Sequence, residues 1–140
     1  METFKPHCCE DEDSLIKGTQ CFVRSFKGTD KSLDESLKGV APKVAIKVAA
    51  KMLSQLEQLA NGGQLRCPDK FNTEAPLPGK STGHFFAVKV RIAGVNLRAY
   101  VFKYGSDWWI SHYTNKKNQK LSDSDTNRVH GNYRFLNGNS

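Results

Sequence analysis

An alternating pattern of apolar residues over positions 84–114 constrains the fold of this chain more than any other feature. Its first part places an apolar side chain at every second position, at Phe86, Val88, Val90 and Ile92. Two breaks follow, Gly94-Val95 and Gly105-Ser106, and each suits a two-residue turn with glycine first. Because period two is typical of strands, the pattern predicts an antiparallel meander of three strands, at 84–92, 97–102 and 108–114.

Cations concentrate in the same part of the chain. Residues 84–120 hold one acid, Asp107, and seven cations: Lys89, Arg91, Arg98, Lys103, Lys116, Lys117 and Lys120. This excess accounts for most of the formal net charge of +7. Since strands hold side chains in fixed positions, the pattern predicts a cationic surface with an anionic partner and favours nucleic acid as that partner.

The first predicted hairpin gathers part of this charge on one face. A turn at Gly94-Val95 pairs Arg91 with Arg98. The same register pairs Lys89 with Tyr100. Like charges that lie directly opposite each other destabilise a sheet, so their presence here indicates a function that uses them. We expect the three cations to lie together on an accessible side of the sheet.

The N-terminal half predicts one strand and two helices. Residues 19–26 alternate in part and predict a first strand. Ser32 and Glu35 have the spacing of a capping box, which predicts a short helix that starts there and stops at Gly39. From Pro42 onward, apolar residues recur at three- and four-residue spacing up to Ala60, which predicts a long helix.

Together these elements predict an α+β fold, with two N-terminal helices packed on a twisted antiparallel sheet. Residues 64–83, rich in proline and glycine, are expected to form a connecting loop. The strands and helices then follow in the order β-α-α-β-β-β, with a short helix or turn over residues 122–133. Residues 1–17 are expected to be an N-terminal extension, and residues 18–140 a single domain.

The spacing of the cysteines does not favour a disulfide framework. The four cysteines, Cys8, Cys9, Cys21 and Cys67, form no CxxC pair, so we expect reduced thiols, no metal and no cofactor. A soft-metal site that combines His7, Cys8 and Cys9 with a further cysteine is the alternative. An acidic run at 10–13 is unlike a secretory signal, and no apolar stretch is long enough for a membrane span, so the expected location is cytoplasmic, without membrane contact.

The cationic residues suit metal-independent cleavage of RNA. In that reaction the ribose 2′-hydroxyl attacks the adjacent phosphate, which requires a proton acceptor, cations to stabilise the phosphorane, and a donor to the departing 5′ oxygen. Repulsion from Arg91 and Arg98 favours the neutral form of Lys89, which is therefore the candidate general base. The two arginines are candidates to hold phosphate oxygens.

Several side chains near the third predicted strand are candidates to supply a proton or stack on a base: Tyr100, His112, Tyr113 and His130. The lysines that follow this strand are candidates for RNA contacts: Lys116, Lys117 and Lys120. Each also has a purely structural alternative. Tyrosines fill cores, a single histidine is commonly structural, and lysines on exposed strands keep edges soluble.

Five sequence pieces occur in a recognisable order: a leucine-rich stretch ending in glycine at 56–62, Cys67-Pro68, the segments 83–91 and 97–102, and residues 111–120 with their Lys-Lys-Asn-Gln-Lys element. This combination, over roughly residues 19–133, resembles the RelE/HigB-like toxins of bacterial type II toxin–antitoxin modules (RelE/ParE superfamily). The specificity of the resemblance lies mainly in the lysine-rich element and its position after the third strand of the meander.

The resemblance implies an mRNA endonuclease that causes growth arrest. It also implies three partners: the ribosome, mRNA and a cognate antitoxin that neutralises the toxin. It implies that Lys89, Arg91 and Arg98 act in RNA cleavage, and that His112, Lys116, Lys117 and Lys120 belong to the basic element after the last strand. Two alternatives stay open. One is a ParE-like toxin that inhibits DNA gyrase by binding, and the other is a noncatalytic RNA-binding module.

Overall fold

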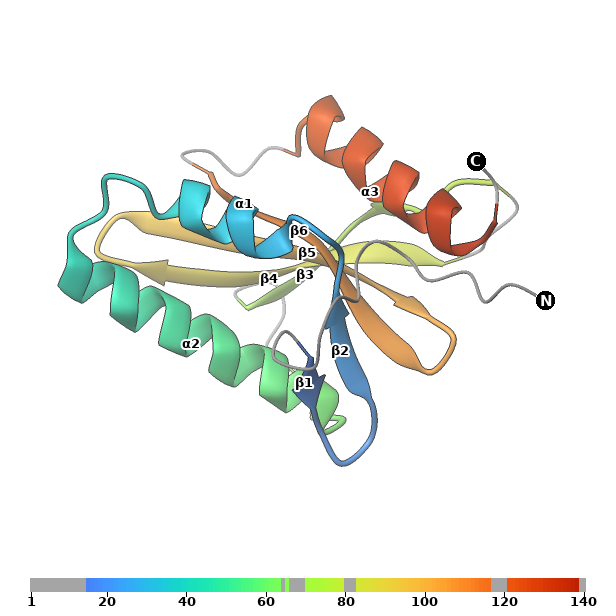
Figure 1. Cartoon of the computed structure of the whole chain (residues 1–140), viewed down its shortest axis with the longest axis horizontal. Helices are drawn as coiled ribbons and strands as arrows, with labels where there is room; N and C mark the ends of the chain where they lie inside the picture. The colour runs from blue at the N-terminus through green and yellow to red at the C-terminus, as the bar shows by residue number, and fades with distance from the viewer. Residues whose placement is uncertain (1–14, 64, 66–69, 80–82, 117–120, 139–140) are drawn as a thin grey trace.

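The computed structural model describes residues 15–63, 65, 70–79, 83–116 and 121–138 (Figure 1). Their helices and strands follow the order β1 (Ile16–Lys17), β2 (Phe22–Ser25), α1 (Thr29–Ser36), α2 (Pro42–Ala60), β3 (Phe71–Pro76), β4 (His84–Ile92), β5 (Val95–Tyr104), β6 (Asp107–Asn115) and α3 (Asp123–Leu136). The fold class is α+β, as predicted. The predicted strand–helix–helix–meander order is present within it, with two further strands, β1 and β3, and a full helix at the C-terminal end.

The strands form one six-stranded sheet in the order β1-β2-β6-β5-β4-β3. β4, β5 and β6 are antiparallel neighbours, so the predicted meander is confirmed. β2 pairs with β6 in parallel, with Val23 opposite Trp108, and the sheet is therefore mixed. The prediction of an antiparallel sheet is wrong at this pair because alternation identifies the buried face of a strand and not the direction of its neighbour.

β3 occupies a stretch that the sequence predicts to be a loop. It pairs with β4 at the sheet edge, and its register shifts between Thr73 and Ala75. This irregularity breaks the alternation in the sequence. Pro76 ends the strand, which an edge strand tolerates because it needs fewer backbone donors than a central one. The loop prediction for residues 64–83 is therefore wrong over this part.

α1 begins at Thr29, before the predicted capping box, and ends at Ser36. Its N-cap is Gly28, which has a left-handed conformation. Ser32 lies inside the helix, where its hydroxyl donates to the Thr29 carbonyl and accepts the backbone N–H of Tyr113 at 3.0 Å. The capping-box prediction is wrong because this serine satisfies a donor at the edge of β6. α1 thus covers part of that edge.

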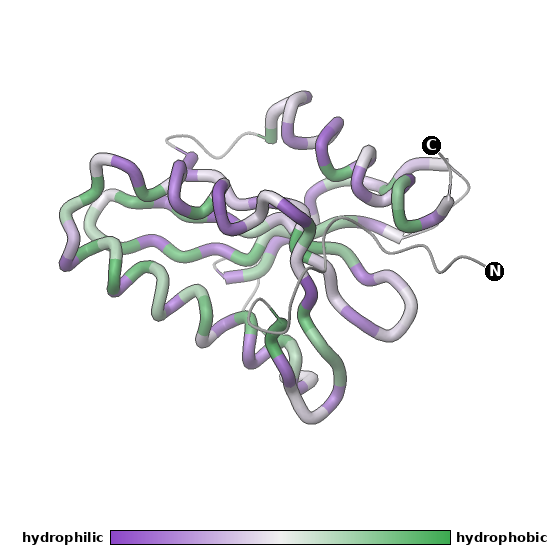
Figure 2. Tube along the Cα trace, viewed as in Figure 1, coloured by the Kyte–Doolittle hydropathy of each residue, from purple (hydrophilic) through white to green (hydrophobic). Residues whose placement is uncertain are grey.

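α2 has the predicted start and end. Its buried apolar side chains are Val48, Met52, Leu56, Leu59 and Ala60, and they pack on the sheet face formed by Val88, Val90, Leu97, Ala99 and Val101. Figure 2 shows how hydropathy differs between the elements: α2 and the long strands contain hydrophobic segments, whereas α1 is mostly hydrophilic.

α3 packs on the opposite face of the sheet (Figure 1). Its Val129 is fully buried in a second apolar cluster with Phe85, Phe102 and Trp109. Trp108, one residue earlier, lies half-buried on the other face beside Phe86, so the two tryptophans face opposite sides of the sheet. Figure 1 shows α3 toward one end of the sheet and the turn between β4 and β5 at the other end, so α3 leaves that turn uncovered.

Candidate nucleic-acid interface

The β4–β5 turn consists of Ala93 and Gly94, because Ile92 pairs with Val95. Both turn residues have positive φ, 50° and 85°, as a type I′ turn requires and as the twist of a hairpin favours. The turn lies one residue earlier than predicted. Each residue therefore keeps its predicted face but meets a different partner.

This register places Lys89 directly opposite Arg98 and Arg91 opposite Asn96. Tyr100 lies opposite Ala87. The predicted pairings of Arg91 with Arg98 and of Lys89 with Tyr100 are wrong. A like-charged pair, Lys89 and Arg98, nevertheless lies across the two strands, and both members belong to the predicted set of three cations.

β6 extends the same face by a third strand. Arg98 pairs with Thr114 and Tyr100 with His112, while the Lys116 N–H donates to the Asn96 carbonyl at 2.9 Å. The side chains consequently form three rows across β4, β5 and β6: Arg91–Asn96–Lys116, Lys89–Arg98–Thr114, and Ala87–Tyr100–His112. We call the four cations of the first two rows the cationic face: Lys89, Arg91, Arg98 and Lys116.

Exposure differs among these cations. Arg91 is exposed and Lys89 is half-buried, whereas Arg98 is only 1 % exposed. The expectation that all three hairpin cations are accessible is therefore wrong for Arg98. It lies on β5, between Lys89 of β4 and Thr114 of β6. Lys89 and Arg91 are the hairpin cations that a ligand can reach directly.

The two tyrosines considered for base stacking are both buried. Tyr100 is fully buried in the row next to the cationic face, and its ring lies 5.1 Å from that of His112. Burial, followed by the charge of Asp125, raises the pKa of Tyr100 to about 12, although Arg98 opposes the shift. Tyr113 is 9 % exposed and belongs to the apolar cluster on the other face. Neither ring offers a base an open surface in this structure.

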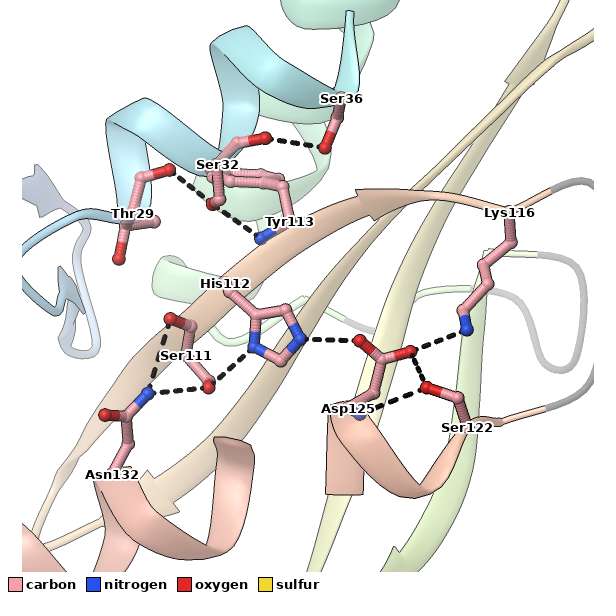
Figure 3. A network of polar contacts seen from close by, with 10 residues as sticks. All are labelled: Thr29, Ser32, Ser36, Ser111, His112, Tyr113, Lys116, Ser122, Asp125 and Asn132. Atoms are coloured by element: carbon pink, nitrogen blue, oxygen red, sulfur yellow. Dashed lines mark hydrogen bonds and ion pairs between the residues drawn. The ribbon is translucent and has the colours of Figure 1, made fainter. Parts of the chain in front are cut away.

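His112 is also buried, with 2 % exposure, and belongs to a polar network (Figure 3). Its Nε2 lies 2.9 Å from Asp125 Oδ1, and its Nδ1 lies 2.9 Å from Ser111 Oγ. A carboxylate only accepts, so Nε2 carries the proton and Nδ1 accepts from the Ser111 hydroxyl. The Asn132 side-chain amide donates to the same hydroxyl oxygen at 2.8 Å.

Asp125, in the first turn of α3, connects His112 to Lys116. Its Oδ2 lies 2.6 Å from Lys116 Nζ and accepts from Ser122 Oγ at 2.8 Å (Figure 3). Ser122 in turn caps α3 by accepting the Asp125 N–H. The carboxylate thus holds the end of the Lys116 side chain, which is 15 % exposed, at the edge of the cationic face.

The charge states of this pair follow from burial and hydrogen bonding. Burial lowers the pKa of His112 below its usual 6.5, and the hydrogen bond to Asp125 opposes this without reversing it. Burial alone would raise the pKa of Asp125, but the hydrogen bonds from His112, Lys116 and Ser122 outweigh it and hold that pKa well below its usual 3.8. At neutral pH, His112 is therefore neutral and Asp125 ionised.

Sequence reasoning missed Asp125. The Ser122-Asp-Ser-Asp125 spacing is itself a capping signal that identifies the start of α3. It does not indicate that the second aspartate reaches His112, which is 13 residues away on β6.

His130 lies away from the cationic face. Its Nε2 is 3.0 Å from the Pro76 carbonyl, a contact that connects α3 to β3. Lys117 and Lys120, together with Cys8, Cys9 and Cys67, lie outside the described residues. Within the described ranges, no group of three or more histidine, cysteine and acidic side chains is arranged to hold a metal ion. No helix in this part of the chain is long and apolar enough to cross a bilayer.

Comparisons of the chain with protein-family models, curated proteins and solved structures gave no match.

Proposed function

We propose that this protein is an endoribonuclease of the RelE/HigB type, which cleaves mRNA on the ribosome and is neutralised by a cognate antitoxin. The observation that carries the proposal is the cationic face, where Lys89 lies directly opposite Arg98 and Arg91 and Lys116 occupy the adjacent row. Cations held in fixed positions on one face of a sheet attract a ligand of opposite charge. RNA phosphates are such a ligand.

In this proposal Lys89 is the general base that takes the proton from the ribose 2′-hydroxyl. Lys89 is half-buried, lies in the position paired with Arg98 and shares its face with the exposed Arg91. Arg91, which is exposed, holds the oxygens of the scissile phosphate. The attack forms a 2′,3′-cyclic phosphate as the bond to the 5′ oxygen breaks, and the departing oxygen takes its proton from water. No metal is required.

The buried residues have supporting roles. Arg98 lies too deep to contact RNA directly, so it contributes positive charge from below the surface. His112 acts on Lys116 through Asp125 and is a positioning residue, not the proton donor considered from the sequence. Lys116, which Asp125 holds in place, adds a hydrogen-bond donor for RNA phosphate at the end of β6.

The proposal is tested by mapping transcript ends in cells after brief induction of the wild type and the Arg91→Ala variant. We expect new internal ends and growth arrest with the wild type, and a strong reduction of both with the variant. Lys47→Ala is the matched control, because Lys47 is an exposed cation on α2, against the other face of the sheet. It should behave as the wild type.

Two results would contradict the proposal. Growth arrest without new transcript ends, combined with inhibition of DNA supercoiling, would favour the gyrase-binding alternative. Salt-sensitive RNA binding without any cleaved product would favour the noncatalytic module. Arg98→Ala is a poor test, because loss of a buried guanidinium would alter folding as well as chemistry.

A further inference from the structure

A polar cleft of about 320 Å³ lies beside the cationic face, between α1, β6 and α3. Its lining includes Glu35 and Ser36 from α1, Thr114 and Asn115 from β6, and Arg128 from α3. Thr114 is the residue paired with Arg98, so the cleft begins where the second row of the cationic face ends. From Thr114, Lys89 is two strands away, or roughly 10 Å.

Hydrogen bonds within the protein hold the walls of this cleft in place. The Asn115 side chain donates to the Ser36 carbonyl at 3.2 Å and accepts the Asn96 N–H at 3.1 Å. The Ser36 hydroxyl donates to the Ser32 carbonyl at 2.6 Å. α1 and the end of β6 are thereby joined, so a ligand would enter a cleft that is already formed.

Two charged and exposed side chains of the cleft lining can contact a ligand: the carboxylate of Glu35 and the guanidinium of Arg128. Glu35 is exposed, and none of the ion pairs among the described residues involves it. Arg128 is exposed on the α3 side, and its charge is one of the factors that lower the pKa of His112 at the cleft floor. A planar guanidinium stacks on a nucleobase, and a carboxylate accepts two parallel N–H groups.

We propose that this cleft binds a guanine base of single-stranded RNA, next to the phosphate held on the cationic face. Guanine is the base that presents two adjacent donors, N1–H and the N2 amino group, to a single carboxylate. Glu35 would accept both, and Arg128 would stack on the ring. This inference rests on the proposed function, because it places the base beside the nuclease site, but binding in the cleft can be measured without cleavage.

The test compares the binding of guanosine 3′-monophosphate and uridine 3′-monophosphate to the full chain by isothermal titration calorimetry. Both nucleotides carry the same phosphate, so the difference in affinity reports the base. We expect the wild type to prefer the guanosine nucleotide by about tenfold, the low end of discrimination by one bidentate contact. Glu35→Gln should abolish this preference and leave uridine binding unchanged.

Asp34→Asn is the matched control, because it removes the same charge from the neighbouring, exposed position of α1, which does not line the cleft. It should keep the guanosine preference. Equal affinity of the wild type for both nucleotides, or equal behaviour of the two variants, would overturn the inference. If the protein cleaves transcripts but Glu35→Gln keeps the guanosine preference, the base-site inference fails and the nuclease proposal remains. A Glu35-dependent guanosine preference without any cleavage would reject the nuclease and keep the base site.

Discussion

Replacing Asp125 with asparagine should lower the free energy of unfolding, because three side chains share this carboxylate. Asparagine can still accept from His112 through its oxygen. Its amide group then faces the Lys116 ammonium and the Ser122 hydroxyl, which are both donors. Two hydrogen bonds to a charged group are lost, and the Lys116 charge keeps its position without a counter-ion.

The magnitude follows from the burial of these groups. A hydrogen bond to a charged group contributes about 1.5–3 kcal/mol. Asp125 is 12 % exposed and Lys116 is 15 % exposed, so water compensates for only part of the loss. We expect the free energy of unfolding to decrease by about 2–4 kcal/mol. At about 3 °C per kcal/mol for a chain of this size, Tm falls by about 6–12 °C.

The assay is urea unfolding at pH 7, followed by circular dichroism, with thermal unfolding as a second measurement. Asp123→Asn is the control, because Asp123 is an exposed acid in the same first turn of α3 and has the same favourable position relative to the helix dipole. Its loss should cost no more than about 1 kcal/mol. If the two variants lose the same stability, the carboxylate of Asp125 does not hold the network, and the positioning role of His112 fails with it.

Two further predictions concern the core and the pH dependence of stability. Leu56→Ala should lower the free energy of unfolding by about 2–5 kcal/mol, since Leu56 is 1 % exposed on the buried side of α2. Leu53→Ala, at a position of the same helix with 47 % exposure, should change it by no more than about 0.5 kcal/mol, and equal losses in urea unfolding would contradict the packing of α2. The pKa of His112 in the folded protein lies below 6.5, so on acidification the unfolded chain takes up a proton at this histidine before the folded protein does. Neutral His112 therefore contributes fully to stability above pH 6.5, and this contribution is lost as the pH falls through the folded pKa. The depressed pKa of Asp125 adds a further loss below about pH 4. A series of unfolding measurements from pH 7 to pH 5 should show the first loss in the wild type and a smaller one in His112→Gln, and the same slope in both proteins would contradict the assignment.

Periodicity predicted the parts of the fold in which one side of an element is buried along its whole length. α2 and the β4–β6 meander are of this kind, and their apolar spacing reflects contact with a continuous core. β3 lacks this signal, because an edge strand with a register shift at Thr73/Ala75 has no regular buried side. The parallel pairing of β2 with β6 depends on how the chain returns through α1 and α2, which no local pattern describes.

The candidate site was predicted in part for the same reason. Alternation assigned Lys89, Arg91 and Arg98 to one face correctly, and this assignment survived the change of turn. The turn itself was misplaced because Ala93 adopts positive φ, which alanine rarely does. Alternation also does not indicate how deeply a side chain is buried, so it could not predict the burial of Arg98 on β5. The His112–Asp125 contact joins β6 to α3 and exists only in the folded chain.

The central claim is that the cationic face cleaves RNA by attack of the 2′-hydroxyl with Lys89 as the base. The most direct measurement is the rate at which the purified protein, supplied with ribosomes and mRNA, forms products ending in a 2′,3′-cyclic phosphate. We predict such ends with the wild type and with Lys47→Ala, and a decrease of about 10²-fold or more in Lys89→Ala whose unfolding curve is unchanged. A folded Lys89→Ala protein that cleaves at the wild-type rate would contradict the claim.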